Sequence, residues 1–142
     1  MDRILVLCGS ANSGKTTTLK QVIRMLEISF SICDIEHRIE SEYDERVIFD
    51  VNGKKVGIET QGDPSSRLRE SIPLFVNLNC DLIVCATRTR GQTVKTVIEH
   101  ASSHDIISWR SQSCLSRTEQ REPSNNSIAQ LIVKEVLGLC GA

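Results

Sequence analysis

The stretch from Gly9 to Thr16 has the residue types and the spacing of a phosphate-binding loop. It reads G-S-A-N-S-G-K-T, which matches the pattern G-x-x-x-x-G-K-[ST]. Glycines let the backbone curl, so that successive N–H groups face one small volume and form a nest for an anion. Lys15 can then reach the β- and γ-phosphates of a triphosphate, and the Thr16 hydroxyl can bind Mg²⁺. The stretch therefore predicts a site for ATP or GTP with Mg²⁺.

The sequence on each side of this loop indicates the elements that must position it. Residues 4–8 form an apolar run that ends at a glycine, which is typical of a buried strand. From Leu19 to Leu26 apolar side chains recur on one face of a helix over residues 15–29. Such a helix adds unpaired N–H groups and the positive end of its dipole. The residues expected to contact the nucleotide are Gly9, Ser10, Ala11, Asn12, Ser13, Gly14, Lys15, Thr16 and Thr17, together with Gly62 further along the chain.

On these residues the sequence resembles the P-loop NTPase superfamily over residues 4–26. A strand before the loop and a helix after it are the context that distinguishes this motif from a chance match. The alternative is a glycine-rich turn between a strand and a helix, in which Lys15 is a solvated helix residue.

A second candidate site follows a predicted hairpin. The dipeptide Asn52-Gly53 separates two strand-like runs, 47–51 and 54–60, and is a strong hairpin signal. The second run leads into E-T-Q-G-D at residues 59–63, which resembles the D-T-A-G-Q switch segment of Ras-like GTPases. The resemblance implies that Glu59 holds Mg²⁺ through water and that the Gly62 N–H meets the γ-phosphate.

Asp63 departs from that pattern, because the Ras-like segment has a water-positioning glutamine there. An acid at this position can act as a general base or as a metal ligand. The alternative is that Asp63 caps a helix with Pro64 at its first position. That helix, over 65–79, is expected as two short pieces because of Pro73, with Arg67 and Arg69 as surface charges.

Two further segments could face the ligand. Residues 80–86 predict a buried strand, and the loop after it carries Arg88 and Arg90, which suit a phosphate clamp. This loop resembles the lid of small P-loop kinases, although both arginines could instead be solvated. The acidic segment 31–46 is either a γ-phosphate switch or a solvated connection.

The order of elements predicts the fold class. A helix over 92–102, a strand over 105–110 and a helix that begins with a capping box at Ser127 complete the series. The expectation is a three-layer α/β/α sandwich with a mostly parallel sheet of about five strands and one antiparallel hairpin strand. Residues 1–142 are expected to form a single nucleotide-binding domain.

Composition narrows the partners. The net charge is −1 and aromatic residues make up 4%, which argues against nucleic-acid binding. No apolar run approaches about 18 residues, so no membrane span is expected. The six cysteines form no C-x-x-C pair, which favours free thiols in a reducing compartment over disulfides or zinc. With no signal-peptide pattern at its start, the chain is expected to be cytoplasmic.

Two classes of function fit these features. The first is a Mg²⁺-dependent hydrolase or phosphotransferase, such as a small kinase. The second is a nucleotide-dependent switch that acts on a protein partner, although the guanine-reading N-K-x-D pattern of Ras-like GTPases is absent. The candidate catalytic residues are Lys15, Asp63, Arg88 and Arg90, and the candidate metal ligands are Thr16, Glu59 and Asp63.

Overall fold

The description of the fold rests on a computed structural model of the chain. It describes residues 3–9, 14–33, 38–40, 44–61, 67–88, 105–112 and 118–141, with residues 95, 97 and 99 between them. For residues 9, 105–112 and 118–126 only the backbone is described. Among the sequence-predicted site residues, Ser10, Ala11, Asn12, Ser13, Gly62, Asp63 and Arg90 lie outside the described residues.

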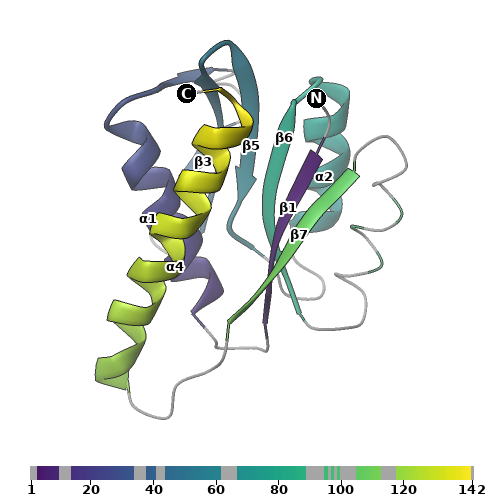
Figure 1. Cartoon of the computed structure of the whole chain (residues 1–142). Helices are drawn as coiled ribbons and strands as arrows, with labels where there is room; N and C mark the ends of the chain where they lie inside the picture. The colour runs from purple at the N-terminus through teal and green to yellow at the C-terminus, as the bar shows by residue number, and fades with distance from the viewer. Residues whose placement is uncertain are drawn as a thin grey trace.

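Among the described elements, four consecutive strands separate the first two helices (Figure 1). The elements are β1 (Arg3–Gly9), α1 (Lys15–Glu27), β2 (Ser31–Cys33), β3 (Ile39–Glu40), β4 (Glu45–Val51), β5 (Lys54–Glu59), α2 (Leu68–Asn77), β6 (Leu82–Thr87), β7 (Asp105–Gln112) and α4 (Thr118–Leu139). The strands predicted at 4–8, 47–51, 54–60, 80–86 and 105–110 are thus confirmed as β1, β4, β5, β6 and β7, within a few residues at their ends.

The strands form one mixed sheet of seven strands, with the order β2-β4-β5-β6-β1-β7 and β3 also paired to β4. Strand β1 is parallel to β6 and β7, and β5 is parallel to β6. Strand β4 is antiparallel to β2, β3 and β5. Half of the pairings are therefore antiparallel, and they gather on one side of the sheet.

This arrangement overturns the predicted fold class. The three-layer α/β/α sandwich with a mostly parallel sheet of about five strands is wrong, because the described sheet is mixed and has seven strands. The difference arises in residues 31–46, which were expected to be either a γ-phosphate switch or a solvated connection, without strands. There Ile32 pairs with Phe49 and Ile39 with Arg46, which adds two short antiparallel strands beside β4. Strands of three and two residues leave almost no alternation for a sequence to reveal.

Side chains alternate between the two faces of the sheet, as the pleat of a strand requires. Leu5 and Leu7 of β1 belong to a buried cluster with residues of α1 and α4. Ile4 and Val6 belong to a second cluster with residues of α2. Helices α1 and α4 therefore cover one face and α2 the other (Figure 1).

Two helices differ from the sequence prediction. Helix α2 is one continuous helix with Pro73 inside it, where two pieces were expected. Pro73 has no N–H, so the carbonyl of Arg69 loses the hydrogen bond that it would normally accept within the helix. Arg69 is an exposed residue of the first turn, where water can replace that bond, and the helix continues. Helix α4 begins at Thr118, so the predicted capping box at Ser127 lies inside the helix. Within the predicted helix 92–102 only residues 95, 97 and 99 are described, and these are helical.

The β4–β5 turn contacts the end of α4. Asn52 and Gly53 both have positive φ angles, 54° and 81°, which suits the two central residues of a hairpin turn. The side-chain amide of Asn52 donates to the carbonyls of Cys140 at 3.0 Å and Gly141 at 3.1 Å. This turn and the two residues that follow α4 are therefore joined at one end of the molecule.

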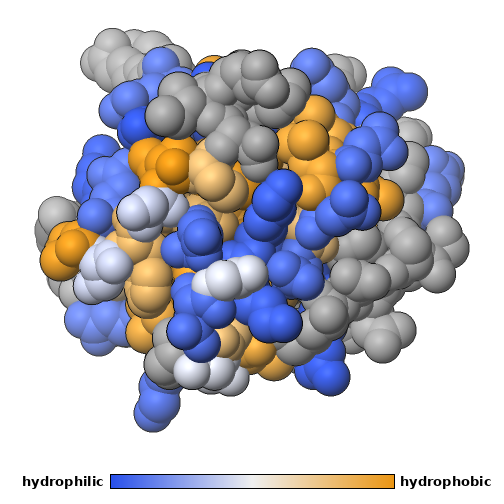
Figure 2. Space-filling view, turned by 90° about the horizontal axis from the view of Figure 1, so that it is seen from above, coloured by the Kyte–Doolittle hydropathy of each residue, from blue (hydrophilic) through white to orange (hydrophobic). Residues whose placement is uncertain are grey.

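Figure 2 shows that same end of the molecule from above, with hydrophobic and hydrophilic residues interspersed over it. Helix α1 begins at the opposite end (Figure 1). None of the helices described is both long enough and apolar enough to cross a membrane.

Candidate functional site

The start of α1 has the backbone geometry that the phosphate-loop motif predicts. Gly14 precedes the helix with φ 88° and ψ 14°, in the left-handed region that favours glycine. Its carbonyl accepts the N–H and the hydroxyl of Thr18, each at 2.9 Å. No acidic residue lies in the first turn of this 13-residue helix. The helix therefore keeps its positive N-terminal end uncompensated by a carboxylate of that turn.

The three residues after Gly14 differ in exposure. Lys15 is the first residue of α1 and is only 6% exposed. Thr16 is half-buried and Thr17 is exposed. A lysine held at the start of a helix, with a threonine next to it, is the pair that the motif requires for phosphate and Mg²⁺.

The carboxyl ends of three parallel strands meet beside this helix start. Cys8 near the end of β1 is in register with Thr87 at the end of β6, and the Cys8 thiol donates to the carbonyl of Arg88 at 3.5 Å. Strand β5 lies on the other side of β6, with Ile58 in register with Val84. The backbone of Arg88 is thus brought to the same edge as the loop between β1 and α1.

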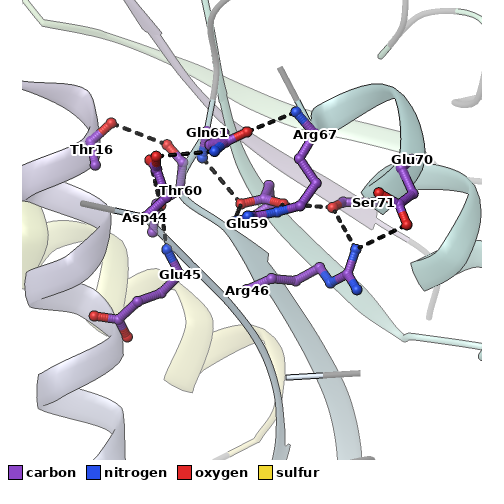
Figure 3. Close-up of polar contacts among 10 residues, drawn as sticks. All are labelled: Thr16, Asp44, Glu45, Arg46, Glu59, Thr60, Gln61, Arg67, Glu70 and Ser71. Atoms are coloured by element: carbon purple, nitrogen blue, oxygen red, sulfur yellow. Dashed lines mark hydrogen bonds and ion pairs between the residues drawn. The ribbon is translucent and has the colours of Figure 1, made fainter. Parts of the chain in front are cut away.

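Glu59 lies at the end of β5, but its side chain points away from α1. Ile58 packs in the cluster that contains α1, so the alternation of the strand directs Glu59 to the face of α2. Its carboxylate is fully buried and accepts from Arg67 Nε at 2.7 Å and Nη2 at 2.8 Å (Figure 3). It also accepts from the Ser71 hydroxyl at 2.5 Å and from the Gln61 N–H at 3.2 Å. The predicted metal ligand therefore has both oxygens engaged with α2 and the end of β5.

Arg67 is the residue whose role the sequence analysis missed most clearly. It was expected to be a surface charge, yet its side chain is 16% exposed and forms the ion pair with Glu59. The hydrogen bond to that carboxylate raises the pKa of Arg67 above its usual value. Arg69, also expected at the surface, is exposed. Since the partner of Arg67 lies eight positions earlier on a strand, no helical spacing could have revealed it.

Thr16, the other predicted metal ligand, contacts β5 through a main-chain carbonyl. The Thr16 hydroxyl donates to the carbonyl oxygen of Thr60 at 3.4 Å (Figure 3). The Thr60 hydroxyl in turn accepts from the Glu45 N–H at 2.9 Å and donates to Asp44 at 3.4 Å. Thr60 therefore joins the first turn of α1 to the start of β4.

Gln61 extends this junction to α2. Its side-chain amide donates to Asp44 Oδ2 at 3.0 Å, and its side-chain oxygen accepts from the Arg67 N–H at 2.7 Å (Figure 3). Asp44 belongs to the acidic segment 31–46, and Arg67 directly precedes α2. Gln61, to which the sequence analysis gave no role, therefore connects the E-T-Q-G-D segment both to the acidic segment 31–46 and to the residue before α2.

The chain was compared with protein-family models, with curated proteins and with solved structures. None of the three comparisons gave a match. The chemistry of the site therefore rests on the residues described above.

The donor set at the start of α1 fits an anion and a hard divalent cation. The N–H groups at the start of α1, together with the buried Lys15, suit phosphate oxygens. Mg²⁺ usually keeps several waters and takes few protein ligands besides the phosphates, so one hydroxyl from Thr16 is compatible with it. Among the described residues no group of three or more histidine, cysteine, aspartate or glutamate residues could hold a metal ion by itself. A cation here would thus depend on the phosphates.

A second polar contact lies one turn further along α1. Lys20 Nζ is 4.0 Å from a carboxylate oxygen of Glu45, and both side chains are largely buried. Burial raises the pKa of Glu45, and the nearby Lys20 opposes that shift. Glu45 also makes two hydrogen bonds with Thr60, because its N–H donates to the Thr60 hydroxyl and its carbonyl accepts from the Thr60 N–H. These contacts hold together α1, the start of β4 and the residue that follows β5.

Proposed function

We propose that this chain binds ATP or GTP with Mg²⁺ at the start of α1 and catalyses phosphoryl transfer to water or to a small acceptor. One observation carries the proposal. Gly14 adopts the left-handed conformation directly before α1, and Lys15 is buried as the first residue of that helix. Because the loop follows a strand that is parallel to its neighbours, its position is also the usual one for ligands in such sheets.

Each residue has a distinct part in this proposal. Lys15 and the helix N–H groups would neutralise the β- and γ-phosphates, and the Thr16 hydroxyl would bind Mg²⁺. Bound Mg²⁺ would offset the charge of the phosphate oxygens. Arg88 follows β6 at the same edge, where its guanidinium could reach a phosphate. Phosphoryl transfer depends mainly on positioning and charge neutralisation, which these groups supply.

A nucleotide-dependent switch that acts on a protein partner is the second candidate. The observation in its favour is that Gln61 connects Asp44 of the acidic segment to Arg67 at α2. A movement of Thr16 on nucleotide binding could therefore pass through Thr60 to Asp44 and from there, through Gln61, to Arg67. Slow turnover and a large nucleotide-dependent change in amide exchange around Asp44 and Arg67 would favour the switch over the enzyme.

The proposal is tested by nucleotide binding to the wild-type protein and to Lys15→Ala. The wild-type protein should be stabilised against heat by ATP or GTP with Mg²⁺, and should release phosphate with or without an added acceptor. Lys15→Ala should lose this stabilisation while its circular dichroism stays unchanged. Lys134→Ala, an exposed lysine on α4, is the matched control and should behave as wild type. Equal affinity of Lys15→Ala and wild type for both nucleotides would contradict the proposal.

A further inference from the structure

The peptide unit that joins Thr60 to Gln61 lies between Glu59 and Thr16. Its N–H donates to Oε2 of Glu59 at 3.2 Å, and its carbonyl accepts from the hydroxyl of Thr16 at 3.4 Å (Figure 3). The described chain contains no cis peptide bond, and in a trans peptide the N–H and the C=O point in opposite directions. A carboxylate that holds the N–H on one side therefore aims the carbonyl at Thr16 on the other.

The Glu59 carboxylate and the Gln61 side chain, on which the orientation of this peptide depends, are both held in place. The Glu59 carboxylate is fixed by two parallel hydrogen bonds from Arg67, an arrangement that restrains its plane as well as its position. The Gln61 side chain is fixed at both of its polar atoms, by Asp44 and by the Arg67 N–H. The orientation of the peptide is thus determined by contacts on both sides of β5.

The orientation of the Thr16 hydroxyl follows from that of the carbonyl. A hydroxyl has one proton and two lone pairs. When Thr16 gives its proton to the Thr60 oxygen, its lone pairs remain available to a cation. The negative charge on the N–H side also polarises the peptide and makes its carbonyl a better acceptor.

We propose that Glu59 is a positioning residue, which acts on Thr16 through the Thr60–Gln61 peptide and does not bind Mg²⁺ itself. This inference rests on the proposed function, because it explains how the proposed Mg²⁺ ligand, Thr16, is oriented in the same site. It replaces the direct metal contact that the resemblance to Ras-like GTPases implied for Glu59. The carboxylate is fully buried and faces α2, whereas Thr16 lies on the face of α1.

The test compares two double variants that remove both charges of the Glu59–Arg67 ion pair, because removing one alone would leave the other without its partner. Glu59→Met with Arg67→Met removes the acceptor for the Gln61 N–H and keeps the bulk of both side chains. Glu59→Gln with Arg67→Gln is the conservative pair, because it removes the charges and retains an acceptor. Asn52→Ala serves as the control for general destabilisation, since it loses its contacts with Cys140 and Gly141 at the opposite end of the molecule.

The readout is the ratio of ATP affinity with Mg²⁺ to ATP affinity in EDTA, measured by calorimetry, with GTP in place of ATP if it binds more tightly. The methionine pair should lower this ratio about threefold to tenfold, as expected for one lost hydrogen bond. The glutamine pair should recover part of the loss. Asn52→Ala should lower the unfolding temperature and leave the ratio unchanged. In all variants the affinity in EDTA should stay as in wild type.

Thr16→Val distinguishes an indirect role from a direct one. If Glu59 acts through Thr16, the methionine pair should cause no further loss in the Thr16→Val background, because the two changes then remove the same interaction. Losses that add would show that Glu59 contacts the metal separately and would overturn the inference. An unchanged ratio in the methionine pair would also overturn it. A wild-type protein that binds neither ATP nor GTP would instead overturn the proposed function, and the inference with it.

Discussion

Arg67 and Glu59 form a bidentate ion pair that links the residue before α2 to the last residue of β5. Nε donates to one carboxylate oxygen at 2.7 Å and Nη2 to the other at 2.8 Å. The carboxylate is fully buried, and the Arg67 side chain is 16% exposed. The pair therefore fixes the start of α2 relative to the edge of the sheet at which the candidate site lies.

Removing only the cation of this pair should destabilise the fold strongly. Arg67→Met leaves the buried Glu59 carboxylate without its charge partner, and we expect a loss of about 3–5 kcal/mol in the free energy of unfolding. Urea denaturation measures it. Arg69→Met, on the exposed side of α2, should change stability by less than about 0.5 kcal/mol. The double variant with Glu59→Met should be more stable than Arg67→Met alone. If Arg67→Met is as stable as Arg69→Met, the ion pair of Arg67 with Glu59 does not stabilise the fold.

Two glycine-to-alanine changes should have opposite effects. A Cβ at Gly57 would lie 2.7 Å from the ring of Phe75, which is fully buried between β5 and α2. We expect Gly57→Ala to cost about 1–3 kcal/mol, as overpacking does. A Cβ at Gly138 in α4 meets nothing within 4 Å, so Gly138→Ala should gain about 0.5–1 kcal/mol.

Thermal or urea unfolding of both glycine variants gives the comparison. Shortening the ring by Phe75→Leu should recover part of the loss in the Gly57→Ala protein, because it returns the space that the new methyl group takes. A Gly57→Ala protein as stable as wild type would mean that α2 can shift away from β5 at no cost.

Stability should fall with rising pH on account of Glu45. Burial raises the pKa of this carboxyl above 4.5, so the folded chain holds the proton more tightly than the unfolded chain. Below pH 4.5 both states are protonated and no penalty exists, whereas above the raised pKa the folded state carries the cost of a buried charge. Relative to Glu45→Gln, which does not titrate, wild type should lose stability as the pH rises from 4.5 through the raised pKa of Glu45. Parallel stability curves for the two proteins would contradict this.

The Cys85 thiol should resist alkylation in the folded protein. Burial, with a contribution from the negative charge of Glu59, raises the pKa of Cys85 to about 12. Since the thiolate is the reactive form, iodoacetamide near neutral pH should label Cys85 only after the protein is unfolded in urea. Peptide mapping by mass spectrometry identifies the labelled residue. Rapid labelling of Cys85 without denaturant would show that this part of β6 opens readily.

The sequence predicted the features that depend on neighbouring residues. The left-handed glycine before α1, the Asn52-Gly53 turn and the apolar runs of β1 and β6 each depend on a few adjacent residue types. The ion pair of Arg67 with Glu59 could not be predicted in this way, because it requires the position of α2 over the sheet.

The short strands β2 and β3 escaped prediction for a similar reason. Their places are determined by hydrogen bonds to β4, and their own side chains are half-buried or exposed. The direction of the Glu59 side chain was in principle available, since Ile58 and Thr60 must share the opposite face. The alternation along β5 shows that Glu59 and Ile58 face opposite sides of the sheet. It does not show which of these sides α1 covers, and so it does not show whether Glu59 faces the candidate site.

The contact between Asn52 and Cys140 has a consequence for the order of folding during synthesis. The two residues lie 88 positions apart, so their hydrogen bond can form only when the chain as far as Cys140 has left the ribosome. Until then the β4–β5 turn has no partner from α4, and the face of the sheet shared by α1 and α4 is only partly covered. Contacts between distant residues form late and slow the final step of folding. A nascent chain halted before α4 should therefore expose an apolar surface that chaperones recognise.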